Sequence, residues 1–365
     1  MNQNKKAPDG AQLVKEFYGS PRWSGELLDC SMPMTLDTYS VCAYNCLYCF
    51  SYFQRSLGLA QKNYFGRKVK SVDVDKIKKM FLDPDSSKQF GGYIKDRKTI
   101  QWGGLSDQFD TYEKTWGKTL ELLRFFAEIN YPICFSTKAT WWTTDERYVE
   151  LFKGRENWNV KISIITNEAD KARAMEKGCP TPAARFKALE RIASWGGSPP
   201  TLRLRPFIIG VSDATYLDMI REAKNVGCGA VSTEFFCVES RASEHLKARY
   251  KEISKIVGYD LLERYRKYSK GFGYLRLNRN IKHKYINNMD SLCKELGLRF
   301  YVSDAHFKER CCNGSCCGLS ENWNYNRGQF TEALMIAKQN GKVYWSDISS
   351  NAKWLDKINW KKAYG

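Results

Sequence analysis

Three cysteines stand close together near the start of the chain, at Cys42, Cys46 and Cys49, in the sequence C-A-Y-N-C-L-Y-C. Three thiolates on one short loop can hold three irons of a cubane iron–sulfur cluster. Because the loop carries no fourth cysteine, the last iron would stay open to another ligand. The types and the spacing of these residues therefore predict an iron–sulfur centre with one free coordination position.

A zinc site is the alternative reading of the same residues. Such a site normally needs a second pair of cysteines or a histidine pair at a suitable distance. The next cysteine is Cys134, and the three histidines of the chain, His245, His283 and His306, lie far downstream. A chance match to the spacing is expected on the order of a few per cent of the time. The cluster is therefore favoured.

The CxxxCxxC motif, with Tyr48 immediately before its last cysteine, closely resembles that of the radical S-adenosylmethionine (SAM) superfamily. The resemblance implies a 4Fe-4S cluster whose open iron chelates the amino and carboxylate groups of SAM. It also implies reductive cleavage of SAM to a 5'-deoxyadenosyl radical. A one-electron reductant such as flavodoxin or ferredoxin would then be a partner.

Longer motifs resemble the spore photoproduct lyase-like branch of this superfamily, in the same order, between about residues 35 and 215. They are G-G-L-S-D-Q-F-D-T-Y-E from residue 103, F-S-T-K at 135–138, V-K-I-S-I-I-T at 160–166, M-E-K-G-C-P-T-P-A-A-R-F at 175–186 and L-R-P-F-I-I-G at 204–210. The cofactor-binding residues that the resemblance implies are Tyr48, Gly103, Gly104, Lys138, Ser163 and Arg205, with Lys138 and Arg205 also as catalytic candidates.

These residue types suit the implied roles. A Gly-Gly pair lets the backbone approach the amino group of SAM, although a plain turn would also use it. The Lys138 charge and the Ser163 hydroxyl are suited to a carboxylate or a ribose. Arg205 could face the cofactor, and Glu176 could pair with Arg185; for Arg205 and Glu176 a structural ion pair is an equal alternative.

One departure from the branch concerns the hydrogen donor. The lyase carries a cysteine just ahead of its Thr-Ser-Asp stretch that returns a hydrogen atom to the product radical, whereas residues 103–107, G-G-L-S-D, contain none. Photoproduct reversal by that route is therefore not expected. Hydrogen return from 5'-deoxyadenosine would make the reaction an isomerisation, and another residue such as a tyrosine is the alternative donor.

Alternating strand and helix patterns surround these motifs and predict the elements that position them. Between the strands, Trp116 to Ala127 and Phe186 to Ala193 carry apolar residues at helical spacing. Such alternation predicts an α/β fold, a partial (β/α)6 TIM-like barrel whose active-site residues gather at the carboxyl ends of its strands. The predicted strands are 35–41, 98–102, 132–137, 159–165, 202–209 and 230–236.

We predict three parts of the chain: an N-terminal arm (1–30), the partial barrel (31–245) and a basic, aromatic and cysteine-rich C-terminal region (246–365). The C-terminal region is expected to be mostly helical, with an amphipathic stripe from Ile281 to Leu296 and a last strand over 298–303. It extends the barrel rather than repeating it.

A second group of cysteines, Cys311, Cys312, Cys316 and Cys317, lies in this C-terminal region. Adjacent cysteines rarely both ligate one ion, so a simple zinc site is not obvious. Three hypotheses stay open. The first is an auxiliary iron–sulfur cluster or zinc site, with Cys293 or Cys30 as a further ligand. The second is thiols that face the active site as hydrogen donors, and the third is thiols without a role.

Charge points to a polyanionic partner. The chain has 58 Lys and Arg against 40 Asp and Glu, a formal charge of +18. Residues 264–284 hold eight of these cations and no acid, interleaved with Tyr265, Tyr268, Phe272 and Tyr274. Cations and stacking rings are the composition of a nucleic-acid groove. A solvated helix face with its aromatics in the core is the alternative, as is a charge that only aids solubility.

Composition also limits the class of protein. The hydrophobic content of 43% is enough for a core, and the 13 cysteines in an odd number argue against a disulfide framework. Neither a signal-peptide core nor a membrane-length apolar run occurs, so we expect a cytoplasmic protein without a membrane partner.

Three functions remain open from the sequence. The first is a radical SAM enzyme, of lyase or isomerase type, that abstracts hydrogen from a nucleic-acid base or base substituent, with DNA favoured. The second is a radical SAM maturase of a peptide or protein with an auxiliary cluster. The third is a non-enzymatic nucleic-acid-binding metalloprotein.

Overall fold

The structure is a computed structural model, and it describes residues 6–14, 20–24, 30–51, 68–269, 273–313, 315–326, 341–342 and 344. Part of the predicted N-terminal arm and most of the tail beyond residue 326 therefore lie outside the described residues, as do Lys270 and Phe272 of the basic segment.

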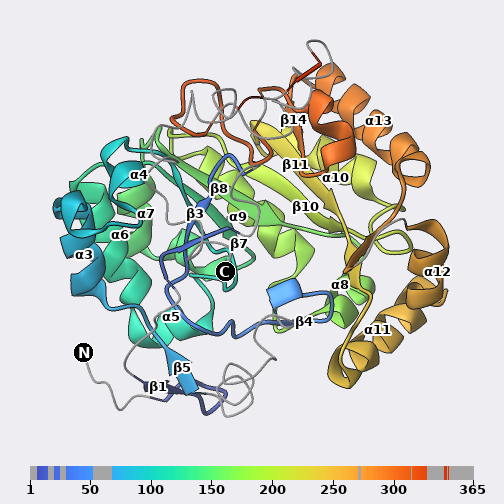
Figure 1. Cartoon of the computed structure of the whole chain (residues 1–365), viewed down its shortest axis with the longest axis horizontal. Coiled ribbons are helices and arrows are strands. Elements are labelled where there is room, and N and C mark those ends of the chain that lie inside the picture. Colours follow the sequence, from blue (N-terminus) through green and yellow to red (C-terminus); the bar gives the residue numbers. More distant parts are fainter. Residues whose placement is uncertain are drawn as a thin grey trace.

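One large sheet forms the centre of the molecule (Figure 1). Its strand order is β14-β11-β10-β8-β7-β6-β3-β2, and all neighbours run parallel except β2, which pairs antiparallel with β3. The strands are β2 (Arg22–Trp23), β3 (Met34–Leu36), β6 (Ile100–Trp102), β7 (Ile133–Thr137), β8 (Trp158–Ser163), β10 (Thr201–Phe207), β11 (Ala230–Phe235) and β14 (Arg299–Val302).

Helices follow most of the parallel strands and lie around the sheet (Figure 1). They are α3 (Val74–Leu82), α4 (Gly91–Lys95), α5 (Thr111–Trp116), α6 (Lys118–Glu128), α7 (Glu146–Phe152), α8 (Ala169–Met175), α9 (Pro182–Ala193), α10 (Tyr216–Asn225), α11 (Glu244–Val257), α12 (Leu261–Tyr268) and α13 (Arg279–Glu295), with short 3-10 turns at Pro84–Ser86, Trp141–Thr144 and Ala305–Arg310. None of them, within the described part of the chain, has the length and apolar character that crossing a bilayer requires.

Three small ribbons complete the fold. β1 (Gln12–Val14) pairs parallel with β5 (Lys68–Lys70), and β12 (Cys237–Glu239) pairs antiparallel with β13 (Tyr274–Arg276). The third ribbon joins β4 (Asn45–Cys46) to β9 (Glu176–Lys177), again antiparallel. Because β4 contains the middle cysteine of the motif, this ribbon ties the cysteine loop to the segment after α8.

The two faces of the large sheet differ in chemistry. Successive residues of a strand point to opposite faces. On one face Trp102, Phe135, Ile162 and Leu204 join the main hydrophobic core with the helices. The alternate positions form a polar face, whose residues are Gln101, Ser136, Lys161, Arg203 and Ser232. A closed barrel normally fills such a face with branched apolar side chains, so this one is unusual.

A segment of the C-terminal region, residues 315–326, covers the amino ends of the strands; we call it the floor segment. The backbone N–H of Thr99, just before β6, donates to the carbonyl of Asn324 at 2.7 Å, and Asn326 N–H donates to Ser31 O at 2.9 Å. Gly318 packs so closely on Thr201 that a Cβ would lie 2.8 Å from its hydroxyl oxygen. The amino end of the sheet is therefore closed by residues far away in the sequence.

The predicted α/β architecture with a parallel sheet is confirmed. Each predicted strand corresponds to an observed one, and the last, predicted over 298–303, is β14, which joins the edge of the same sheet beside β11. The predicted amphipathic helix is α13, and it ends before Gly297 at a φ of +67°. The exact (β/α)6 barrel, its helical extension and the domain boundaries stay predictions.

Candidate functional site

The cysteine loop lies at the carboxyl end of β3, beyond Leu36. Cys46 is 5% exposed, and Cys42 and Cys49 are half-buried. The β4–β9 pairing and a bond from Leu47 N–H to Met175 O (2.8 Å) fix the middle of the loop. In parallel sheets ligands bind beyond the carboxyl ends of the strands, so the loop is where the sequence predicts it.

Arg249 on α11 clamps this loop from outside. Its guanidinium donates to Leu47 O at 3.2 Å, to the Asn45 side chain at 3.0 Å and also to Cys46 O. Loop carbonyls would otherwise need water as donors, so one planar fork fixes the turn between the second and third cysteines.

Three aspartates join the neighbouring loops to each other. Asp37 accepts from the backbone N–H of Leu105 (2.7 Å) and of Ser106 (2.9 Å), just after the Gly-Gly pair. Asp110, the N-cap of α5, accepts from Ala43 N–H at 2.7 Å, inside the cysteine loop. Burial raises the pKa of Asp110 well above its usual range, although the hydrogen bond from Ala43 N–H lowers it in part.

The third aspartate, Asp107, reaches the end of β7. It accepts from the Thr137 hydroxyl at 2.7 Å and from Lys138 N–H at 2.6 Å. Burial raises the pKa of Asp107, and these hydrogen bonds lower it. The loop after β6 is thereby held against the strand end that carries Lys138.

Gly103 follows β6 with a φ of +88°, in the left-handed region that favours glycine. A Cβ there would lie 2.5 Å from Ser136 O and 2.3 Å from the Gln108 side chain. At Gly104 a Cβ would lie 2.8 Å from the Arg22 guanidinium. Gly103 therefore requires glycine for packing reasons, whether or not the turn also contacts a ligand, whereas at Gly104 the nearest atom is the end of the flexible Arg22 side chain, which can move away.

Tyr48 is held by a buried ion pair. Its hydroxyl donates to one oxygen of Glu176, and the Arg185 guanidinium donates to the other. Arg185 also donates to Ser163 O at 2.7 Å and to Pro180 O at 2.9 Å. Both ion-pair side chains are 1% exposed, so the predicted Glu176–Arg185 pair is present and fully buried.

Lys138 brings a positive charge to the cysteine loop. Its Nζ lies 5.6 Å from the centre of the Tyr48 ring. Burial lowers the pKa of the Lys138 ammonium, but Cys46, Glu176 and Cys179 nearby outweigh it and raise the pKa above its ordinary value. The structure thus brings Tyr48, Lys138 and the middle cysteine together.

Cys179 is a fourth thiol beside the loop, which the sequence reasoning did not single out. Its Sγ lies 3.6 Å from that of Cys46, and this contact lowers the pKa of Cys46 while burial opposes the change. The residue follows β9, so only the pairing of β9 with β4 brings the two thiols together.

The chemistry of the donor set suits an iron–sulfur cluster. No group of three or more His, Cys, Asp or Glu is arranged to hold one metal ion in the part of the chain that the structure describes. A cubane cluster spreads its thiolates over three irons instead of converging them on one atom. Three thiols on one loop beside the Lys138 cation therefore match the cluster chemistry.

Ser163 and Arg205 lie at the carboxyl ends of β8 and β10. Ser163 is 3% exposed and is the register neighbour of Arg203. Arg205 forms an ion pair with Glu234 on the neighbouring β11. Arg205 therefore forms a structural ion pair, which was one of the two predictions for it, and its contact with a cofactor stays a prediction.

The second cysteine group is divided by the structure. The Cys311 and Cys312 thiols bind the backbone of β14, at Val302 (3.2 Å) and Phe300 (3.3 Å). Cys316 and Cys317 lie in the floor segment with their sulfurs 3.5 Å apart. Cys316 also lies within electrostatic range of Cys30 and Cys311, which raise its pKa after Cys317 and burial, and a second metal site stays a prediction.

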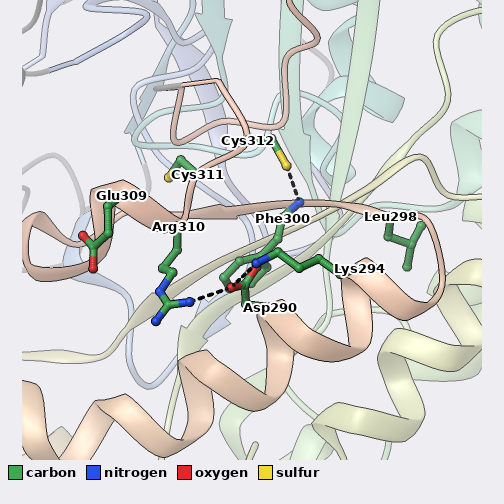
Figure 2. Close-up of a pocket in the computed structure, with 8 residues that line it drawn as sticks. All are labelled: Asp290, Lys294, Leu298, Phe300, Glu309, Arg310, Cys311 and Cys312. Carbon is green, nitrogen blue, oxygen red and sulfur yellow. Dashed lines mark hydrogen bonds and ion pairs between the residues drawn. The ribbon is translucent and has the colours of Figure 1, made fainter.

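A pocket of about 360 Å³ lies beside the first two of these cysteines (Figure 2). One of its two acidic residues, Asp290, is already bound by Lys294 at 2.9 Å and Arg310 at 3.0 Å through the same oxygen. Its walls come from α13, β14 and the following turn, so the pocket does not include the cysteine loop (Figure 2).

The basic segment only partly forms the predicted surface. Tyr265 is 1% exposed, and its hydroxyl donates to Phe236 O. Lys282 is buried against Asp304. These two side chains face the core, as the alternative to a nucleic-acid surface predicts. Tyr274 is exposed, with the Arg276 guanidinium 6.0 Å from its ring centre. The exposed cations of the segment are Arg266, Lys267, Arg276, Arg279 and Lys284.

Comparisons with known proteins identify the fold. A cysteine-to-serine mutant of spore photoproduct lyase matches 80% of this chain and 82% of its own, at a TM-score of 0.58 and 16% identity. Spore photoproduct lyase complexed with dinucleoside spore photoproduct matches the same shares at a TM-score of 0.56 and 16% identity. Another mutant of the lyase, with bound AdoMet and dinucleoside spore photoproduct, matches 80% of this chain and 81% of its own, at a TM-score of 0.56 and 16% identity.

No protein-family model matches the sequence, and no curated protein matches it. The chain has the fold of spore photoproduct lyase, and the predicted resemblance is confirmed at the level of fold.

Proposed function

We propose that the chain is a radical SAM enzyme that abstracts hydrogen from a nucleic-acid base or base substituent. The observation that supports this most is the position of the three-thiol loop: it lies beyond the carboxyl ends of the strands, beside Lys138, in a chain with the fold of spore photoproduct lyase. That lyase is solved with AdoMet bound.

Cys42, Cys46 and Cys49 would hold a 4Fe-4S cluster. When bound, the cluster supplies the electron that cleaves SAM to a 5'-deoxyadenosyl radical. The chain's own residues position the reactants. The Lys138 ammonium is suited to a carboxylate, and the Ser163 hydroxyl to a ribose or carboxylate. Arg249 and the Glu176–Arg185 pair keep the loop in place.

Nucleic acid is the substrate class that the charge supports. The formal charge is +18, and five exposed cations accompany Tyr274 on the described part of residues 264–284. Cations neutralise phosphates, while an exposed ring can stack on a base. Solved structures of the lyase contain a dinucleoside photoproduct. Because a duplex hides its bases, the substrate would be an extruded nucleotide or a single strand, with DNA favoured.

The reaction would be an isomerisation or another conversion without the lyase's thiol. Gly104 and Leu105 occupy the loop where the lyase-like branch carries its donor cysteine. Hydrogen would then return to the product radical from 5'-deoxyadenosine, which makes SAM a recyclable cofactor.

Anaerobic reconstitution tests the cofactor. We expect about four irons per chain and, with dithionite, conversion of SAM to 5'-deoxyadenosine. The Cys42→Ala/Cys46→Ala/Cys49→Ala variant should lose both. A wild-type protein that takes up iron but never yields 5'-deoxyadenosine would overturn the enzyme proposal. Iron that remains in the triple variant would reveal a second cluster among the C-terminal cysteines.

Binding tests the substrate class. We expect single-stranded DNA to bind the reconstituted protein with an affinity that falls steeply with salt. Replacing Arg276 and Lys284 with Gln should weaken this binding, whereas Arg173→Gln, at an 80% exposed position on α8, should not. Preference for an acidic peptide over DNA at equal salt would contradict the proposal and favour a peptide maturase.

A further inference from the structure

The strands that form the polar face carry an unbalanced charge. Among the residues of β6, β7, β8, β10 and β11, the charged ones are Lys161, Arg203, Arg205 and Glu234. Arg205 is paired with Glu234. Lys161 and Arg203 therefore stand on the same face without a carboxylate partner on these strands.

Among the described residues, the hydrogen bond of the Lys161 ammonium goes to a neutral group. Its Nζ is 2.7 Å from the Gln101 side-chain oxygen, and the Gln101 amide in turn donates to the Ser136 hydroxyl at 3.1 Å. Lys161 is 2% exposed. An ammonium in such a place normally has an anion beside it, because desolvating a charge without one is costly.

Arg203 is the second cation of the face, two positions before Arg205 on β10. No hydrogen bond of its guanidinium is found within the described part of the chain, and its electrostatic neighbours are Arg205, Glu234 and the thiols of Cys317 and Cys134. Burial, together with repulsion from Arg205, lowers the pKa of Arg203 to about 10. A guanidinium has five N–H donors, so an unbonded one inside a sheet face is free to bind a ligand.

Ser232 supplies an unsatisfied hydroxyl at the same place. It is the direct register neighbour of Arg203 on β11, it is 5% exposed, and its Oγ has no hydrogen-bond partner among the described atoms. Buried hydroxyls are nearly always bonded. Two strands therefore present neighbouring donors that the protein itself leaves unused.

The direction of entry limits which part of a ligand reaches these donors. The floor segment closes the amino end of the strands, next to Thr99 and Thr201. A ligand that enters from the carboxyl ends, past the cysteine loop, would meet Arg203 with its leading part. For an extruded nucleotide the leading part is the base, because the sugar and phosphates remain with the strand.

We propose that Lys161, Arg203 and Ser232 form an oxyanion site for a carboxylate or phosphate carried on the substrate's base, beyond the atom that loses hydrogen. This inference rests on the proposed function, and it names the kind of base: one with an anionic substituent. A planar guanidinium binds two oxygens of such a group, and the hydroxyl and the ammonium complete its hydrogen bonds.

Nucleoside binding to the reconstituted protein with SAM, measured by calorimetry, tests the site. The probes are 5-carboxy-2'-deoxyuridine, thymidine and thymidine 5'-monophosphate. We expect the carboxylated nucleoside to bind about 10- to 100-fold more tightly than thymidine. Arg203→Met should abolish this advantage, and Ser232→Ala should reduce it several-fold. Arg221→Met, on the outside of α10, should leave it unchanged. If thymidine 5'-monophosphate bound more tightly than thymidine by the same factor as the carboxylated nucleoside, the proposal that the anion is carried on the base would be overturned.

Thermal unfolding without nucleoside separates binding from a structural role. Cys317, whose pKa is lowered first by Cys316 and then by Lys161, Arg205 and Arg203, is the competing counter-ion inside the fold. If Arg203 served that thiol, Arg203→Met would lower the melting temperature, and the proposal would fail. We expect the same or a higher melting temperature, because the variant removes an unpaired cation.

Substrate-free cleavage of SAM separates this inference from the proposed function. Wild type and Arg203→Met should produce 5'-deoxyadenosine at similar rates, since the proposed cofactor residues, Ser163 beside it included, do not include Arg203. Cleavage without any preference for the carboxylated nucleoside would overturn the oxyanion site and leave the enzyme proposal standing.

Discussion

The buried Glu176–Arg185 ion pair gives the sharpest stability prediction. Arg185→Met removes the cation and leaves Glu176 as an unpaired buried carboxylate, at a cost of about 3–5 kcal/mol. It also leaves the carbonyls of Ser163 and Pro180 without their donor, at about 1 kcal/mol each. We therefore expect a loss of about 5–7 kcal/mol in the free energy of unfolding. Glu176→Gln retains both carbonyl bonds and should cost about 3 kcal/mol.

The double variant tests the reasoning. With Glu176→Gln and Arg185→Met together no buried charge remains, so the loss should fall to about 2 kcal/mol, that of the two carbonyl bonds, and stay below that of Arg185→Met alone. Urea unfolding of the four proteins in their cluster-free, reduced form gives the coupling energy. If the losses of the two single variants summed to the loss of the double variant within about 0.5 kcal/mol, the claim that the two side chains act as one unit would be refuted. Iron uptake should fall in the single variants, because Tyr48 loses its fixed acceptor.

Three further outcomes are expected. Gly103→Ala should cost about 3 kcal/mol and weaken SAM binding, whereas Gly154→Ala, also at positive φ but with open space around it, should cost about 1 kcal/mol; urea unfolding compares them. Burial raises the pKa of Cys228 to about 12, so the native state keeps a proton that the unfolded chain loses near pH 8.5. Stability should therefore fall as pH rises above about 8.5, and Cys228→Ala should reduce that slope by up to about 1.4 kcal/mol per pH unit in urea unfolding at pH 8–10. Arg249→Gln should lower the iron content after reconstitution relative to Arg173→Gln, by freeing the cysteine loop; equal iron contents would contradict the clamp.

The sequence predicted the sheet because its strands have a strong local signal. Runs such as residues 202–209 are apolar enough to mark buried strands, and cysteine spacing alone located the loop after β3. The Glu176–Arg185 pair was also within reach, because the two residues lie in one motif. Such features depend on neighbours in sequence, which a single chain displays directly.

Tertiary partners were not predictable in the same way. β4 and β9 have two residues each, too few for any periodicity, so the contact of Cys179 with Cys46 could not be foreseen. Arg249 lies more than 200 residues from the carbonyls it binds. The polar face did leave a signal: T-L-R-L-R in β10 alternates, whereas strands buried on both faces read as continuous apolar runs.

The floor segment also has a kinetic consequence. Thr99 and Asn324, which it joins, are separated by 225 residues, so their contact closes one of the longest loops in the fold. The entropy of closing a loop must be overcome before the contact stabilises anything, and such non-local pairings slow folding. During synthesis the strands emerge well before their cover does. We therefore expect the sheet to assemble first with its amino end solvated, and the interior to be sealed in a late, slow step.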